Sequence, residues 1–211
     1  MHGIVASRPE DDSVIEVRLG RDVGGAERIE PVAARLGVQV DWGSSDAPVT
    51  TIDGIAVAPD APEWAIEALT LRALRPRHIL FLCVANSARS QLAEGIARHL
   101  AQGTVEISSA GSAPTSVRPQ AVTVMGEIGL DISGQTSMGL DDVHGTVDAV
   151  ITLCAEEVCP VWLHSAWRLH WGLPDPAAVE GSENEQLEAF RTVREELLMR
   201  LGVLLGDQPG R

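Results

Sequence analysis

Cys83 and Arg89 are the residues whose types and spacing most directly indicate chemistry. Five residues separate them, and Ser90 follows at once, between an apolar run and a helical pattern. A loop placed between a strand and a helix can turn its backbone N–H groups toward one tetrahedral oxyanion, and the helix adds its positive N-terminal end. Arg89 offers a planar pair of donors and Ser90 a hydroxyl. The same field favours the thiolate of Cys83, the nucleophilic form. The residues expected to line this loop are Val84, Ala85, Asn86, Ser87, Ala88 and Arg89.

The other two cysteines, Cys154 and Cys159, lie five positions apart, and Cys154 ends an apolar run of its own. Three cysteines cannot all pair with one another, and a reducing compartment disfavours structural disulfides. Three buried thiols acting as small apolar residues are the alternative. The pair does not have the usual spacing of zinc ligands, and the six histidines show no ligand spacing either, so no such metal site is expected. His170, next to Trp171, is expected to be a packed strand residue.

The composition excludes several classes of function. The formal net charge is −14, and all 16 basic residues are Arg. We expect no nucleic-acid or anionic-membrane surface, because both need clustered positive charge. No run approaches the roughly 20 apolar residues that span a bilayer, and the N-terminus lacks the apolar stretch of a signal peptide. The expected location is the cytoplasm, and an anionic substrate must be held by local groups.

Residues 77–211 show the pattern that would position the loop. Strands alternate with helices, which predicts an α/β fold with a doubly wound, parallel, four-stranded sheet. Such sheets place their sites at the carboxyl ends of the strands, where Cys83 and Cys154 both fall. The expected strands are 78–82, 105–108, 148–153 and 169–171, and the expected helices are 90–102, 119–128 and 183–205.

The pattern of residues 1–76 predicts a small α/β domain that precedes the domain formed by residues 77–211. Its pattern is strand, helix, strand, strand, helix, over 14–19, 25–36, 38–42, 50–58 and 62–74. With Ala47-Pro48-Val49 leading into a strand, this order is similar to the second half of a thioredoxin-like domain. The segment contains no cysteine, so such a relative would lack redox chemistry. A small packing or docking module is the alternative.

The segment from Cys83 to Gly95 reads Cys-x5-Arg-Ser-Gln-Leu-Ala-Glu-Gly. It resembles the opening of the low-molecular-weight tyrosine phosphatases and, more closely, of the arsenate reductases that share their fold. The resemblance covers residues 78–205. It recurs at 109–111, 128–133, 150–154 and 170–176. It implies that Asp175, before Pro176, protonates the oxygen that leaves, and that the Asn86 side chain fixes the shape of the loop.

Both families begin with attack of Cys83 on a tetrahedral oxyanion, arsenate or a phosphate-like anion. The resemblance to thioredoxin-coupled arsenate reductases implies a relay in which Cys154 attacks Cys83 and Cys159 then attacks Cys154. No tightly bound cofactor is expected, and thioredoxin is the expected electron donor, with mycothiol or glutathione and glutaredoxin as alternatives. A phosphatase using Cys83, Arg89 and Asp175 would not need the other cysteines. A non-catalytic oxyanion or redox sensor is the third interpretation.

The sequence departs from the family at three places. Position 88 is Ala, where many of these reductases have a further cysteine that is not one of the relay thiols. The spacing from Cys154 to Cys159 is shorter than in the best-known members, so the exchange is expected to need the helix between them to unwind. Some members bind potassium, but the position of a later Asp ligand is Met138 here, which leaves the set incomplete. The potassium-site candidates are Asn86, Glu94, Ser109 and Thr136.

Overall fold

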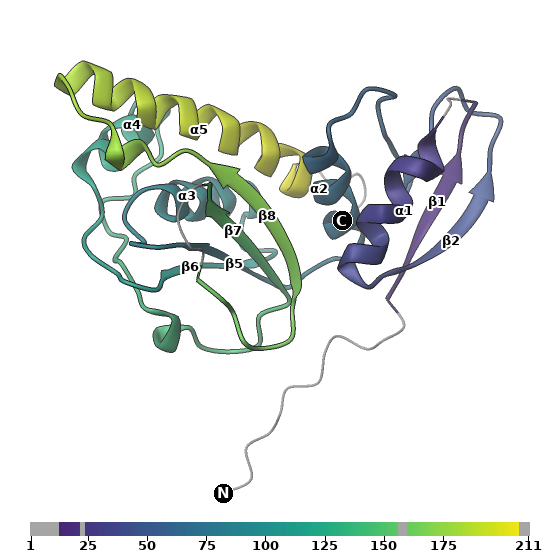
Figure 1. Ribbon diagram of the computed structural model, residues 1–211, viewed down its shortest axis with the longest axis horizontal. Helices are drawn as coiled ribbons and strands as arrows, with labels where there is room; N and C mark the ends of the chain where they lie inside the picture. The colour runs from purple at the N-terminus through teal and green to yellow at the C-terminus, as the bar shows by residue number, and fades with distance from the viewer. Residues whose placement is uncertain (1–12, 22–23, 156–159, 207–211) are drawn as a thin grey trace, which may run out of the picture.

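The computed structural model describes residues 13–21, 24–155 and 160–206. Two four-stranded sheets follow one another along the chain, and Figure 1 shows them side by side with α2 between them. The strands of the first sheet are β1 (Val14–Leu19), β2 (Gln39–Ser44), β3 (Thr51–Ile52) and β4 (Ile55–Ala56). The strands of the second are β5 (His78–Cys83), β6 (Glu106–Gly111), β7 (Ala149–Cys154) and β8 (Trp167–Leu173). The α-helices are α1 (Gly25–Leu36), α2 (Glu63–Ala73), α3 (Arg89–Ala101), α4 (Pro119–Gly126) and α5 (Glu183–Leu205).

The second sheet is parallel throughout, in the order β6-β5-β7-β8, as the alternation of strands and helices predicted. Every residue of its central strand β5 is buried. Ile79 and Phe81 pack into the main core beneath the helices, whereas Leu80 and Leu82 face a smaller cluster that contains Trp162. Because both faces of β5 are covered, its sequence is apolar without alternation.

The first sheet has the order β2-β1-β3-β4, with β1 parallel to β2 and antiparallel to β3. The region 50–58, expected as one strand around the turn at Asp53-Gly54, is instead a hairpin of two short strands. The turn itself lies where the sequence placed it, and both of its residues have positive φ. Gly37 ends α1 in the left-handed conformation, and its N–H reaches the carbonyls of Ala33 and Ala34.

Helix α2 lies between the two sheets and packs against both parts of the chain. The Arg72 guanidinium donates to the Val203 carbonyl of α5 at 3.0 Å, and Arg200 of α5 lies over the ring of Trp64 at 5.4 Å. The main hydrophobic core therefore runs without a break from residues of α1 and β1 to those of α5. The domain boundary near residue 76 stays a prediction.

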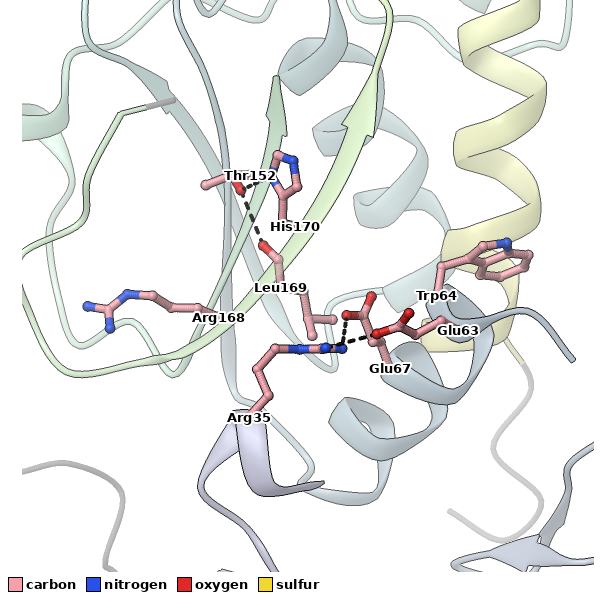
Figure 2. A pocket seen from close by; sticks show the side chains of 8 residues that line it. All are labelled: Arg35, Glu63, Trp64, Glu67, Thr152, Arg168, Leu169 and His170. Carbon is pink, nitrogen blue, oxygen red and sulfur yellow. Dashed lines mark hydrogen bonds and ion pairs between the residues drawn. The ribbon is translucent and has the colours of Figure 1, made fainter. Parts of the chain in front are cut away.

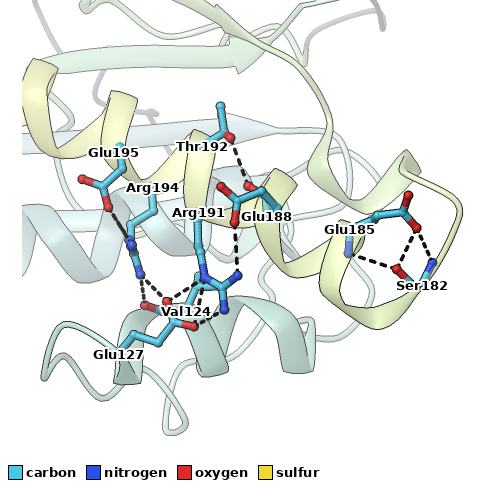
Figure 3. Close-up of polar contacts among 9 residues, drawn as sticks. All are labelled: Val124, Glu127, Ser182, Glu185, Glu188, Arg191, Thr192, Arg194 and Glu195. Carbon is cyan, nitrogen blue, oxygen red and sulfur yellow. Dashed lines mark hydrogen bonds and ion pairs between the residues drawn. The ribbon is translucent and has the colours of Figure 1, made fainter.

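Helix α5 is fixed at its start and along its length, as Figure 3 shows. Ser182 and Glu185 form a capping box, so the acidic residues there do suit the positive end of the helix. Arg191 and Arg194 both reach Glu127 beyond the end of α4, at 2.6 and 2.8 Å. These two guanidinium groups lower the pKa of Glu127 to about 2. Among the described residues, no helix is both long and apolar enough to cross a bilayer.

Candidate active site

The loop between β5 and α3 turns its carbonyl groups outward. The carbonyl of Val84 accepts from the Ala113 N–H at 2.9 Å, that of Ala85 from the Thr115 N–H at 3.0 Å, and that of Ser87 from the Arg118 N–H at 2.9 Å. The Asn86 carbonyl accepts from the Gln91 and Ser137 side chains. Since the C=O and N–H of a trans peptide point in opposite directions, the amides that follow these carbonyls turn inward, as an oxyanion loop requires.

Asn86 holds this loop from inside. It has a left-handed backbone, with φ 45°, and its side chain is fully buried. Its Oδ1 accepts from the Met138 N–H at 2.7 Å and from Gln91 Nε2 at 3.0 Å. Because a backbone N–H can only donate, this contact fixes the orientation of the amide. The Nδ2 group therefore faces Ser90 and Ser109, and donates to their hydroxyls at 2.8 and 2.7 Å.

That orientation decides what Ser90 offers to Cys83. The Ser90 hydroxyl oxygen accepts a hydrogen bond from Asn86 Nδ2, so its own hydrogen remains available for another partner. Cys83 Sγ lies 3.0 Å from Ser90 Oγ, and the Cys83 side chain is buried at the end of β5. Ser90 can thus donate a hydrogen bond to the sulfur, and such a bond stabilises a thiolate more than a thiol.

Arg89 and Asp175 lie together beside the loop. Arg89 is the first residue of α3 and is buried, and its Nη1 donates to the Leu173 carbonyl at 3.1 Å. Its Nη2 lies 3.6 Å from Asp175 Oδ1. Asp175 precedes Pro176 at the start of a short 3-10 helix, η2 (Pro176–Ala178), and accepts from the Ala177 N–H at 3.2 Å. The Asp175 side chain is one-third exposed and lies on the side of the loop where Arg89 is.

Cys154 is the last residue of β7, the strand next to β5, and is buried. The register pairs Leu82 with Thr152, so Cys154 lies one residue beyond the level of Cys83 on a strand about 4.8 Å away. The two cysteines are not joined in a disulfide. Cys159 lies outside the described residues, and so does most of the segment between it and Cys154.

Three of the potassium-site candidates, Glu94, Ser109 and Thr136, lie around the fourth, Asn86, and oxygen atoms of all four already have partners. Asn86 turns its Nδ2, a donor, toward Ser109. Ser109 donates to Glu94 Oε2 at 2.5 Å, and the other oxygen of Glu94 lies 2.6 Å from Arg98. The Thr136 carbonyl accepts from Gln91. Within the described residues, no three His, Cys, Asp or Glu side chains are grouped as metal ligands. This arrangement does not fit a potassium ion.

A cavity of about 570 Å³ is lined by residues of α1 and α2 on one side and of β7 and β8 on the other, and not by residues of the loop after β5 (Figure 2). Its lining residues are Arg35, Glu63, Trp64, Glu67, Thr152, Arg168, Leu169 and His170. Arg35 reaches Glu63 and Glu67 at 2.8 and 2.6 Å. No cysteine is among the described residues that line it. His170 is exposed here rather than packed, because Leu169 and Trp171 take the inward positions of β8.

Several residues that shape the site were not singled out from the sequence. Gln91 holds both the carbonyl and the side chain of Asn86, Ser137 binds the same carbonyl, and Arg98 pairs with Glu94. Gln91 and Arg98 share the helix that carries Arg89, and helical spacing could have placed Glu94 and Arg98 on one face. Ser137 is distant in sequence, and no local pattern indicates its contact.

Comparison with known proteins agrees with this geometry. The model of the family described as low molecular weight phosphotyrosine protein phosphatase matches residues 78–208. The chain therefore belongs to that family, and the expected fold of the second sheet and its helices is confirmed.

The similar proteins include arsenate reductases. The arsenate reductase of Halalkalibacterium halodurans is 44% identical over 126 residues, which are 58% of this chain and 91% of that protein. The glutaredoxin arsenate reductase of Synechocystis sp. is 36% identical over 132 residues, 61% of this chain and 96% of that protein. A solved structure of an arsenate reductase in the phosphate binding state matches with a TM-score of 0.52 and 37% identity, covering 61% of this chain and 96% of that one.

Proposed function

We propose that this protein reduces arsenate to arsenite through a relay of three thiols. The observation that carries the proposal is a second buried cysteine, Cys154, at the end of the strand next to the Cys83 loop. Hydrolysis of a phosphate ester needs only the first cysteine, whereas reduction needs two electrons from a pair of thiols. The similarity to named arsenate reductases over almost their whole length supports the same reaction here.

In the first step, the Cys83 thiolate attacks the arsenic atom of arsenate. Ser90 and the inward amides of the loop hold the oxyanion and the sulfur, and Arg89 neutralises charge on the anion. One oxygen leaves as water after Asp175 gives it a proton, and a sulfur–arsenic bond forms.

In the second step, the Cys154 thiolate attacks the sulfur of Cys83. The sulfur–arsenic bond breaks and its electron pair stays on arsenic, which is reduced from As(V) to As(III) and leaves as arsenite. Cys83 and Cys154 are oxidised to a disulfide. One arsenate and two thiols thus give one arsenite, one water and one disulfide.

In the last step, the Cys159 thiolate attacks Cys154 and releases Cys83 as a thiolate. The Cys154–Cys159 disulfide is then reduced by a dithiol from a partner protein, for which we propose thioredoxin in the cytoplasm. Glutaredoxin with glutathione is the nearest alternative, because one similar protein is named a glutaredoxin arsenate reductase. Mycothiol is a further candidate.

A coupled assay tests this proposal. The purified full chain is incubated with arsenate and NADPH, and with either thioredoxin and its reductase or glutathione, glutaredoxin and glutathione reductase. We expect NADPH oxidation that requires arsenate and is lost in Cys83→Ser, Cys154→Ser and Cys159→Ser. Activity that survives the last two changes would exclude the relay.

The same variants separate the other two interpretations. Hydrolysis of a phosphate ester that needs Cys83 but neither of the other cysteines would favour a phosphatase. Binding of arsenate without turnover of either substrate would favour a sensor. We expect neither outcome, because Cys154 has no function in them.

A further inference from the structure

Glu94 is a carboxylate buried one turn into α3, and the proposed chemistry of Cys83 does not use it. Burial raises the pKa of Glu94 above its ordinary value, while the Ser109 hydroxyl and the Arg98 guanidinium oppose that rise. A buried carboxylate is stable in its charged form only when a partner compensates the charge that water no longer solvates. The partner that compensates this charge therefore also affects the hydrogen bond that Glu94 accepts from Ser109.

Arg98 is the cation that meets Glu94. Its Nη1 lies 2.6 Å from Glu94 Oε1, four residues earlier on the same helix. Its Nε and Nη2 donate to the Ile107 carbonyl of β6, at 3.4 and 3.3 Å. One guanidinium group thus joins α3 to the strand that carries Ser109. The Arg98 side chain is 55% exposed and that of Glu94 only 8%, so Arg98 reaches the buried carboxylate from the protein surface.

From Glu94 an unbroken series of hydrogen bonds leads to the nucleophile. Ser109 donates to Glu94 at 2.5 Å, and Asn86 donates to Ser109 at 2.7 Å. Asn86 also donates to Ser90 at 2.8 Å, and Ser90 lies 3.0 Å from Cys83 Sγ. The direction of each donor is consistent with the next, because Ser109 accepts from Asn86 while its own hydrogen points to Glu94.

We propose that Arg98 is a positioning residue that takes the place of a bound monovalent cation. Its fixed charge keeps Glu94 ionised, and Glu94 in turn orients the Ser109 hydroxyl, which holds the Asn86 amide in the orientation that Met138 sets, so that Ser90 can donate its hydrogen to Cys83. The Arg98 guanidinium thus supplies the positive charge beside Glu94, and no potassium ion is needed there. The proposal concerns the thiol chemistry of the proposed function, but the reactivity of Cys83 can be measured without arsenate.

The test measures the rate at which iodoacetamide alkylates Cys83 in the full chain at neutral pH, followed by mass spectrometry of the Cys83 peptide. We expect Arg98→Met to slow alkylation on the order of tenfold, the effect of weakening one hydrogen bond to a charged sulfur. Arg98→Lys keeps the charge and should stay close to the wild type. Alkylation of Arg98→Met at the wild-type rate would overturn the proposal.

A double variant separates charge compensation from a merely structural contact. Glu94→Gln removes the charge that Arg98 compensates, so it should slow alkylation about as much as Arg98→Met does, and the double variant should be no slower than either single variant. Independent structural roles of the two residues predict losses that add in the double variant. The matched control is Arg200→Met, which breaks an ion pair of the same length and spacing with Glu196 but has no connection to Cys83. Its alkylation rate should not change.

Changing the cation in solution gives a further test. In the wild type, exchanging sodium chloride for potassium chloride at equal ionic strength should change neither the alkylation of Cys83 nor the rate of arsenate reduction. In Arg98→Ala, added guanidinium chloride at concentrations below those that unfold the protein should restore alkylation. A wild-type chain that requires potassium, or an Arg98→Ala variant that folds but is not rescued, would contradict the proposal. If arsenate is not reduced at all, the alkylation results still decide the role of Arg98.

Discussion

Gly111 ends β6 against the oxyanion loop, and its replacement by alanine tests how closely that loop is held. An added Cβ would lie 2.8 Å from the Asn86 backbone nitrogen and closer still to the Val84 carbonyl, whereas ordinary contact begins near 3.4 Å. The other side of Gly111 is fixed, because its N–H donates to the Met138 carbonyl at 2.9 Å. The loop must therefore retreat by roughly 0.6 Å at Asn86 and on the order of 1 Å at Val84.

A displacement of about 1 Å in groups that hold a reacting anion lowers the rate on the order of 100-fold. We expect Gly111→Ala to lower kcat/KM for arsenate by about that factor, and to lower the free energy of unfolding by about 1–3 kcal/mol. The assays are the coupled reduction and urea unfolding followed by tryptophan fluorescence. A variant that folds and retains activity within about twofold of the wild type would refute the tight packing of this loop.

The remaining predictions concern other single contacts. Gly202→Ala, in the interior of α5, where no atom of another described segment lies within 4 Å of the added Cβ, should leave activity unchanged and stabilise the fold by about 0.4–1 kcal/mol, and a loss in either assay would count against the packing of α5 described here. Ser90→Ala should slow alkylation of Cys83 by about tenfold, since it removes the donor to the sulfur, while Ser90→Thr should retain most of the rate. Glu127 has its pKa lowered to about 2 from 4.5, so its stabilising effect is complete above pH 4.5 and is lost as the pH falls toward 2. Acid unfolding curves of Glu127→Gln should therefore show a weaker loss of stability over that range than the wild type, and equal slopes would contradict the ion pairs with Arg191 and Arg194.

Much of the catalytic part could be predicted because its signals are local. The apolar run of β5, the loop from Cys83 to Arg89 and the helix after it are contiguous, so strand, loop and helix were each placed within a residue or two. The parallel sheet then places Cys154 at the end of the strand next to that of Cys83, one residue beyond its level. The family resemblance made the placement of Asp175 an expectation, and the structure places it next to Arg89.

What the sequence could not predict depends on contacts between distant segments. The orientation of Asn86 is set by Met138 and Gln91, and its effect on Cys83 becomes apparent only when Ser90 is seen to accept from it. Asn86, Glu94, Ser109 and Thr136 match potassium-binding positions by residue type, but Glu94 is paired with Ser109 and Arg98, and the Thr136 carbonyl accepts from Gln91. The prediction that His170 is packed was wrong, because its apolar neighbours Leu169 and Trp171 take the inward face of β8. The packing of α2 against α5 likewise joins elements that are more than 100 positions apart.

The proposed relay is tested most directly in a single turnover without any external reductant. The fully reduced chain is mixed with excess arsenate, arsenite is counted, and the disulfides are identified by mass spectrometry. The relay predicts one arsenite per chain with a Cys154–Cys159 disulfide in the wild type, one arsenite with a trapped Cys83–Cys154 disulfide in Cys159→Ser, and no arsenite in Cys154→Ser. Arsenite formed by Cys154→Ser, or a wild-type chain that yields none, would contradict it.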